Sequence, residues 1–185
     1  MGRLIYSFNV SLDGFIETVD HSVDWGLIDA EVHGYFNEQT RALDASLYGR
    51  RLWELMSGYW PTAKDDPNAT PYMLEFAEAW NTTPKFVFSN TLEHADHGAR
   101  IVRGDVGEEL AKVRREFDGD LEVGGPNLAA QFIERGLVDE YRLVVHPVSI
   151  GGGTPFWPAG RRLSVREIDS RTFANGVRLL TYVPA

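Results

Sequence analysis

Apolar and polar residues follow two different periods along the chain, and the order of these periods predicts the fold class. Short, nearly continuous apolar runs are typical of buried strands, and they lie at 3–10, 45–48, 85–88, 100–103, 121–123 and 140–148. Apolar residues at helical spacing predict helices over 30–43, 51–56, 71–81, 106–117 and 128–135. Two alternating segments, 162–170 and 177–183, are joined by Ala174-Asn175-Gly176, which is a hairpin signal.

Strands that alternate with helices favour a mostly parallel sheet covered by helices on both faces. We therefore expect an α/β three-layer sandwich with a mixed sheet and an antiparallel C-terminal hairpin, formed as one domain over residues 1–185. Ligands of such sheets bind beyond the carboxyl ends of the strands. The polar, proline-containing segment 58–71 is expected to be a long surface loop.

Composition excludes several classes of function. The formal net charge of −9 disfavours nucleic-acid partners, because an acidic surface repels a phosphate backbone. The absence of cysteine excludes disulfide scaffolds, thiol nucleophiles and zinc deaminases. The N-terminus does not read as a signal peptide, and no apolar stretch approaches the ~18 residues that span a bilayer. We expect a cytoplasmic protein without a membrane partner.

The predicted strand 45–48 ends at Gly49, and two cations, Arg50 and Arg51, begin the next helix. A helix N-terminus carries partial positive charge and normally disfavours cations. Two arginines there are explained by a bound anion, held by the guanidinium groups and the exposed backbone N–H groups. The alternative is that they pair with surface carboxylates such as Glu54.

Two more strand ends carry residues suited to a nucleotide. Ser89-Asn90-Thr91 offers hydroxyl and amide groups after strand 85–88, although taken alone a polar turn is the simpler explanation. The run 123–128, Val-Gly-Gly-Pro-Asn-Leu, lets a ligand approach the backbone closely; the alternative is a tight turn with Pro126 as first helical residue. Together the three loops predict a binding site for a dinucleotide that lies across the strand ends.

His94 and His97 form a superficially metal-like pair, for which solvated surface is the simpler interpretation and no metal site is predicted. A metal hydrolase built on these histidines stays an alternative function. So does a nucleotide- or ligand-binding protein that keeps the fold without turnover.

Several motifs together resemble one known family. They are Ser11-Leu12-Asp13-Gly14-Phe15-Ile16, Tyr48-Gly49-Arg50-Arg51, Phe88-Ser89-Asn90, Gly124-Gly125-Pro126-Asn127-Leu128 and Gly136-Leu137-Val138-Asp139-Glu140. In this order they resemble the dihydrofolate reductase superfamily. Within it, they resemble the C-terminal reductase domain of the bifunctional riboflavin-biosynthesis deaminase-reductase and its stand-alone bacterial relatives. The resemblance spans nearly the whole chain and implies an NADPH-dependent oxidoreductase.

The resemblance also implies the residues that hold NADPH. Arg50 and Arg51 would bind phosphates, with Ser89 and Asn90 on the 2′-phosphate side, while Ile16 and the lid segment 17–25 would border the nicotinamide. The remaining cofactor candidates are Gly49, Val123, Gly124, Gly125, Pro126, Asn127 and Leu128. Dihydrofolate reductases join the paired glycines by a cis peptide, which the resemblance extends to Gly124 and Gly125.

The catalytic acid and the substrate are less closely specified. Glu31 is the nearest match to the helix-borne carboxylate of dihydrofolate reductases, although a first-turn acid is also typical of any helix. Asn9 and Trp25 are candidate substrate contacts. The substrate would be a small heterocycle, either pterin-like or similar to 5-amino-6-(5-phosphoribosylamino)uracil. The resemblance further implies a homodimer, for which the C-terminal hairpin offers an edge.

Overall fold

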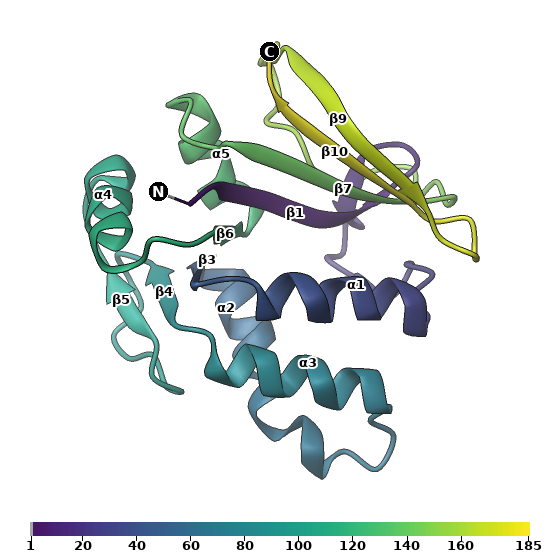
Figure 1. Cartoon of the computed structure of the whole chain (residues 1–185), viewed down its shortest axis with the longest axis horizontal. Helices are drawn as coiled ribbons and strands as arrows, with labels where there is room; N and C mark the ends of the chain where they lie inside the picture. The colour runs from purple at the N-terminus through teal and green to yellow at the C-terminus, as the bar shows by residue number, and fades with distance from the viewer. Residues whose placement is uncertain (1) are drawn as a thin grey trace.

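A twisted sheet of eight strands divides the molecule into two halves (Figure 1). This computed structural model describes residues 2–185. The strand order is β5-β4-β3-β6-β1-β7-β10-β9, and all neighbours from β5 to β7 are parallel. The strands are β1 (Leu4–Ser11), β3 (Ala45–Gly49), β4 (Lys85–Phe88), β5 (Arg100–Val102), β6 (Leu121–Gly124), β7 (Glu140–His146), β9 (Val165–Thr172) and β10 (Arg178–Pro184). The expected mixed sheet with a C-terminal antiparallel hairpin is confirmed.

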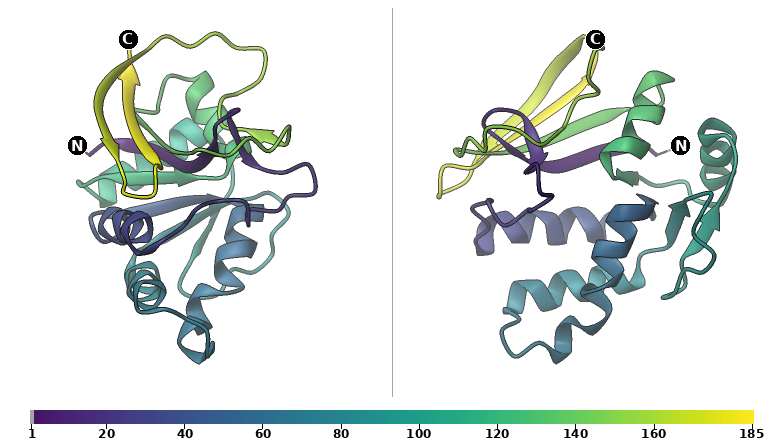
Figure 2. Two further views of the ribbon diagram at one scale, coloured as in Figure 1. Left: turned by 90° about the vertical axis from the view of Figure 1, so that its right-hand side faces the viewer. Right: turned by 180° about the vertical axis from the view of Figure 1, so that it is seen from behind.

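Helices cover both faces of the sheet, as the alternating pattern predicts. In Figure 1, α1 and α3 lie below the central strands and α5 lies above them, and Figure 2 shows the same layering from the side and from behind. The helices are α1 (Ala30–Arg41), α2 (Arg50–Ser57), α3 (Pro71–Thr82), α4 (Val106–Glu116) and α5 (Pro126–Glu134). The result is a three-layer sandwich.

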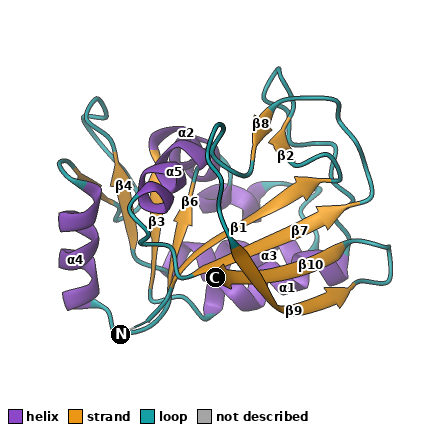
Figure 3. Ribbon diagram, turned by 90° about the horizontal axis from the view of Figure 1, so that it is seen from above, coloured by secondary structure: helices purple, strands orange, loops and turns teal. Residues whose placement is uncertain are grey.

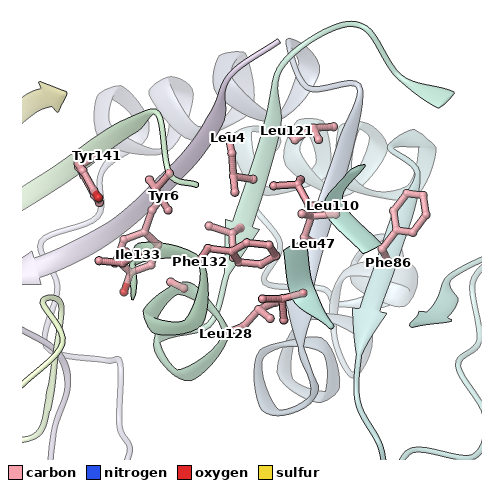
Figure 4. Close-up of a cluster of buried hydrophobic side chains, with 14 of the residues drawn as sticks. Leu4, Tyr6, Leu47, Phe86, Leu110, Leu121, Leu128, Phe132, Ile133 and Tyr141 are labelled. Atoms are coloured by element: carbon pink, nitrogen blue, oxygen red, sulfur yellow. The ribbon is translucent and has the colours of Figure 1, made fainter. Parts of the chain in front are cut away.

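Separate apolar clusters fill the two sides of the sheet. The largest packs α4 and α5 onto the central strands, with Leu4, Leu47, Leu121 and Phe132 fully buried (Figure 4). On the other face, Trp53 and Trp80 stack beneath β3 and β4, and Val32 of α1 packs under β7 and β10. Strands buried on both faces explain why their sequences read as nearly continuous apolar runs.

Two local features differ from the sequence-based expectations. The segment 58–71 contains a short 3₁₀-helix, η1 (Trp60–Asp65), whose Trp60 packs against Phe76 of α3. A small second sheet pairs β2 (Phe15–Glu17) with β8 (Thr154–Pro155). Both elements are too short to produce a recognisable period, and tertiary contacts hold them in place.

The described part of the chain, residues 2–185, contains no helix that combines the length and apolar character needed to cross a bilayer.

At the opposite end of the sheet from β5, β9 is an edge strand with mostly exposed side chains. The homodimer implied by the family resemblance stays a prediction.

Candidate functional site

A cleft of about 1490 Å³ lies at the carboxyl ends of the parallel strands. The strands β3, β4 and β6 run in the same direction, so that their ends open beside α2 and α5 (Figure 3). The cleft is larger than the ~300–1,000 Å³ typical of a pocket for one small ligand. It therefore offers room for a dinucleotide and a second small molecule together.

The three loops singled out by the sequence all line this cleft. Its wall includes Gly49, Arg50 and Arg51 after β3, Ser89 and Asn90 after β4, and the run 124–128 after β6. Ile16, Asn9 and Trp25 line it as well. The structure therefore brings together the cofactor and substrate candidates, with the exception of Val123, whose side chain is buried in the core.

The two helices that begin at the cleft present bare N-termini. Gly49 precedes α2 and Gly125 precedes α5, and neither helix has a side-chain cap within residues 2–185. By contrast, Asp29 caps α1 and Asp105 caps α4. Uncapped backbone N–H groups at a helix N-terminus form a ready site for an anion.

Two glycines of this wall occupy positions that a larger residue would not fit. A Cβ atom added to Gly124 would lie 2.6 Å from Cδ2 of Leu52, and Gly125 has a φ of +103°. None of the peptide bonds described is cis, so the cis Gly124–Gly125 bond implied by the resemblance is not present. Pro126 is the first residue of α5, as expected for a tight turn after β6.

Both arginines of the cleft have carboxylate partners. The Nε of Arg50 donates to Glu54 at 2.7 Å and its Nη1 donates to Thr91 at 2.7 Å. Arg51 donates to the carboxylate of Glu17, a buried residue that also accepts from Thr154. Burial alone would raise the pKa of Glu17, but the hydrogen bonds from Arg51 and Thr154 outweigh it and lower the pKa.

These residues fit a phosphorylated dinucleotide. Two bare helix N-termini supply positive potential, and the two exposed arginines can exchange their carboxylate partners for phosphates. The hydroxyl oxygen of Ser89 accepts from the backbone N–H of Leu92 at 3.0 Å and so closes its own turn. Ser89 therefore supports the loop shape, and its hydroxyl hydrogen is left for a ligand.

A buried histidine organises the other end of the cleft. The backbone N–H of Leu27 donates to Nδ1 of His146 at 2.9 Å, so Nε2 carries the hydrogen and donates to Oδ1 of Asn9 at 2.9 Å. Burial lowers the pKa of His146 to about 4, which keeps the ring neutral at neutral pH. Because Oδ1 of Asn9 faces the histidine, its Nδ2 hydrogens are left for the cleft.

Trp25 adds a second donor beside this histidine. Its ring meets His146 edge-on at 5.4 Å between centroids, and it lines the cleft. The indole Nε1 is buried and has no hydrogen-bond partner within the described residues. A buried donor without a partner costs about 1–3 kcal/mol. Nε1 of Trp25 and Nδ2 of Asn9 together suit a ligand with carbonyl or ring-nitrogen acceptors.

The floor of the cleft holds a carboxyl group that the sequence interpretation missed. Glu122 of β6 lines the cleft on the face of the sheet that α1 covers, and its Oε1 accepts from Nε2 of Gln39. Burial raises the pKa of Glu122 to about 7. The sequence does carry a signal, because Glu122 lies between the two buried apolar residues Leu121 and Val123 of a short strand.

Glu31, the predicted proton donor, is in a different place. Its carboxylate accepts from Arg171 at 2.8 Å and from the backbone N–H of Ala174 at 2.9 Å. It is not among the described residues that line the cleft. The assignment of Glu31 as the catalytic acid is therefore wrong: this first-turn acid instead holds the β9–β10 hairpin against α1.

His94 and His97 lie outside the cleft, in the loop between β4 and β5. Within residues 2–185 no group of three or more His, Asp or Glu side chains is arranged to hold a metal ion.

The carboxylate of Asp13 joins the loop after β1 to the loop after β7, beside the small sheet of β2 and β8. Asp13 accepts from Ser11 at 2.7 Å, from Ser149 at 2.8 Å and from the backbone N–H groups of Ile150 and Gly151 at 3.2 and 2.8 Å. The Ser11 hydroxyl contributes most to a pKa of Asp13 that lies well below the usual range. The loop after β1 and the glycine-rich loop 151–153 are thereby fastened together.

Comparisons of this chain with a family model and with individual proteins identify its relatives. Residues 3–179 match the RibD C-terminal domain. The chain is 34% identical over 182 residues to YyaP, an uncharacterized protein of Bacillus subtilis (strain 168), covering 97% of this chain and 94% of YyaP. It is also 24% identical over 173 residues to YwjB, another uncharacterized protein of that strain, covering 92% of this chain and 91% of YwjB.

Solved structures share the fold. A provisionally assigned riboflavin biosynthesis protein from Shewanella sp. PV-4 superposes with a TM-score of 0.77 at 22% identity, covering 99% of both chains. A diaminohydroxyphosphoribosylaminopyrimidine deaminase/5-amino-6-(5-phosphoribosylamino)uracil reductase from Thermotoga maritima gives a TM-score of 0.69 at 15% identity, covering all of this chain and 57% of that one. From the extent of the family match and the identity to YyaP, the chain belongs to the RibD C-terminal domain family.

Proposed function

We propose that this protein is an NADPH-dependent reductase that acts on a small heterocyclic substrate. The observation that carries the proposal is the convergence of the Gly49–Arg51, Ser89–Asn90 and Gly124–Leu128 loops on one cleft at the strand ends. The bare N-termini of α2 and α5 support an anionic ligand there. The volume of the cleft, about 1490 Å³, supports a second molecule beside it.

The side chains divide the cleft into two parts. Arg50 and Arg51 would hold phosphates, including a 2′-phosphate, and the backbone of Gly124 and Gly125 would accommodate the pyrophosphate. When bound, NADPH supplies a hydride. The lid between β2 and α1, which His146 fastens through Leu27, would exclude water from the other part.

The donors at the substrate end favour a planar ring with carbonyl or nitrogen acceptors. Asn9 and Trp25 present N–H groups, and Phe36 and Trp60 add aromatic wall. A pyrimidine or a pterin has such acceptors on a flat ring that can stack against aromatic side chains. The uracil reductase activity named for the Thermotoga maritima relative agrees with this class.

Titration with NADPH and NADH tests the proposal. NADPH should bind at micromolar concentration, and Arg50→Ala and Arg51→Ala should weaken NADPH far more than NADH. Arg100→Ala is a matched control, because Arg100 is an exposed arginine paired with Glu116 as Arg50 is with Glu54. Failure of NADPH to bind, or equal losses for both nucleotides, would contradict the assignment. Binding without turnover of any pyrimidine or pterin would identify a ligand-binding protein instead.

A further inference from the structure

Glu122 has one oxygen engaged by the protein and one left for the cleft. Its Oε1 accepts from Nε2 of Gln39 at 2.5 Å. Its Oε2 has no hydrogen-bond partner among the described residues, although Glu122 is one of the residues that form the cleft wall. The partial exposure of this side chain is therefore toward the space where a ligand would lie.

The orientation of the Gln39 amide is determined by its other contacts. Its Oε1 accepts from the Tyr35 hydroxyl at 2.6 Å, from Ser7 at 3.3 Å and from Nη1 of Arg142 at 3.3 Å. An arginine donates hydrogen bonds and cannot accept them, so the Gln39 atom beside Arg142 must be the oxygen. Nε2, which carries hydrogens, consequently faces Glu122.

This orientation decides where a proton on Glu122 resides. In a neutral carboxyl group the carbonyl oxygen is the stronger acceptor, so Oε1, which accepts from Gln39, is assigned as the carbonyl oxygen and the hydrogen is placed on Oε2. Oε2 is the oxygen that faces the cleft. A neutral Glu122 therefore presents an O–H group to a bound ligand.

The charges around Glu122 are few. The cation Arg142 of β7 faces Glu122 from the far side of Gln39, and its charge opposes protonation of the carboxyl group. Tyr35 of α1 and Tyr48 of β3 also face Glu122, and both are neutral phenols. Burial raises the pKa of Glu122 to about 7 in spite of Arg142. A ring that fills the cleft removes more water and disfavours the charged form further.

We propose that Glu122 is a catalytic residue, which binds a ring nitrogen of the substrate through Oε2 and delivers a proton to it. Only one part of this proposal, NADPH as the hydride donor, rests on the proposed function. Reduction of a C=N bond to CH–NH adds a hydride at carbon, which NADPH provides while becoming NADP⁺, and a proton at nitrogen, which leaves Oε2. The carboxylate that results is reprotonated from water. The substrate class is therefore a heterocycle with a reducible carbon–nitrogen double bond.

Titration of the carboxyl groups by ¹³C NMR tests the position of this proton without any ligand. In the wild-type protein one carboxyl signal should titrate with a midpoint near 7. Glu122→Gln should remove that signal, and Glu31→Gln, which changes a carboxyl outside the cleft, should keep it. A wild-type spectrum in which every carboxyl titrates below about pH 5, as unperturbed groups do, would overturn the proposal.

Binding of 2-aminopyrimidine, a heterocycle whose ring nitrogens carry no hydrogen and can accept from Oε2, supplies a second readout. Wild-type affinity should fall about tenfold for each pH unit above the pKa of Glu122, because the O–H donor is lost. Glu122→Gln keeps a donor in its amide, so its affinity should not change over the same range. The same pH dependence in both proteins would overturn the proposal.

Turnover is the third readout. Glu122→Gln should lower kcat by roughly 100-fold or more while the Kd for NADPH is unchanged, as expected for loss of a general acid. Glu31→Gln should retain kcat. Should NADPH fail to bind the wild-type protein, the proposed function fails, while the carboxyl titration still decides whether Glu122 carries the proton. Unchanged kcat in Glu122→Gln would exclude the catalytic role.

Discussion

Glu122 and Glu140 lie level with each other on the two strands that flank β1, because both are the parallel partners of Ile5. Glu140 is buried and paired with Arg3 at 2.7 Å and with Arg142 at 2.6 Å. Glu122 receives one amide hydrogen from Gln39 and no ion pair within the described residues. Two carboxyl groups at the same level of one sheet thus have opposite environments, one neutralised by arginines and the other open to the cleft.

The first prediction concerns the stability of Glu122→Gln. The folded-state pKa of Glu122 is raised from 4.5 to about 7, so its proton stabilises the fold fully below about pH 4.5, and this contribution is lost as pH rises to about 7. Above that range the charged carboxylate costs up to about 3 kcal/mol. Glutamine avoids this cost and keeps the contact with Gln39.

Urea unfolding at about pH 8 and about pH 4 measures this difference. Glu122→Gln should be more stable than wild type by about 1–3 kcal/mol at the higher pH and nearly equal at the lower pH. Other titrating groups cancel in the comparison. A difference that does not vary with pH would show that Glu122 ionises normally in the folded protein.

The second prediction compares the two glycines that precede helices at the cleft. Gly125 has a φ of +103°, which an alanine adopts with strain, so Gly125→Ala should destabilise the protein by about 1–3 kcal/mol. Gly49 has a φ of −71°, and an added Cβ would meet Leu128 at an ordinary 3.5 Å. Gly49→Ala should therefore cost less, about 0.5–1 kcal/mol, which is the preference of an N-cap position for glycine over alanine. Equal losses in urea unfolding would indicate that backbone strain is not the cause.

The third prediction concerns acid pH and the lid. The pKa of His146 is lowered from 6.5 to about 4, so its neutral form stabilises the fold above about pH 6.5, and this contribution is lost as pH falls toward 4. A proton on Nδ1 would displace the N–H of Leu27. Hydrogen exchange corrected for pH should show residues 22–28 losing protection near pH 4, before β7 does. Simultaneous loss in both segments would mean that His146 does not control the lid.

The fourth prediction uses two tryptophans as a matched pair. Nε1 of Trp25 has no partner within residues 2–185, whereas Nε1 of Trp80 donates to the Tyr48 hydroxyl at 2.9 Å. Trp80→Phe removes a satisfied buried hydrogen bond and should cost more stability than Trp25→Phe, by about 1–3 kcal/mol. Trp25→Phe should instead weaken binding of 2-aminopyrimidine by about tenfold. Unchanged affinity in Trp25→Phe would place the ligand away from the indole.

The sequence predicts the architecture well where local chemistry and tertiary structure agree. The Asn175-Gly176 turn joins β9 and β10 as the sequence predicts. Gly49 and Gly125 lie on one cleft because both follow parallel strands. These inferences depend on the direction of neighbouring strands and on turn chemistry, both of which act over short distances in the sequence.

The catalytic candidates could not be placed in the same way. An acid in the first turn of a helix has a favourable interaction with the helix dipole wherever the helix lies, so Glu31 carried no information about the cleft. Glu122 and His146 depend on partners in other elements: Gln39 is 83 residues from Glu122, and Leu27 is 119 residues from His146. Which side chains face them follows from how α1 packs under the sheet.

The Asp13 carboxylate has a consequence for how the two loops beside the small sheet move. Four donors converge on it, one from Ser11 at the end of β1 and three from residues 149–151. Asp13 is exposed, so water can replace any single donor. Four contacts held at once nevertheless couple the two loops, which are expected to shift together as one unit.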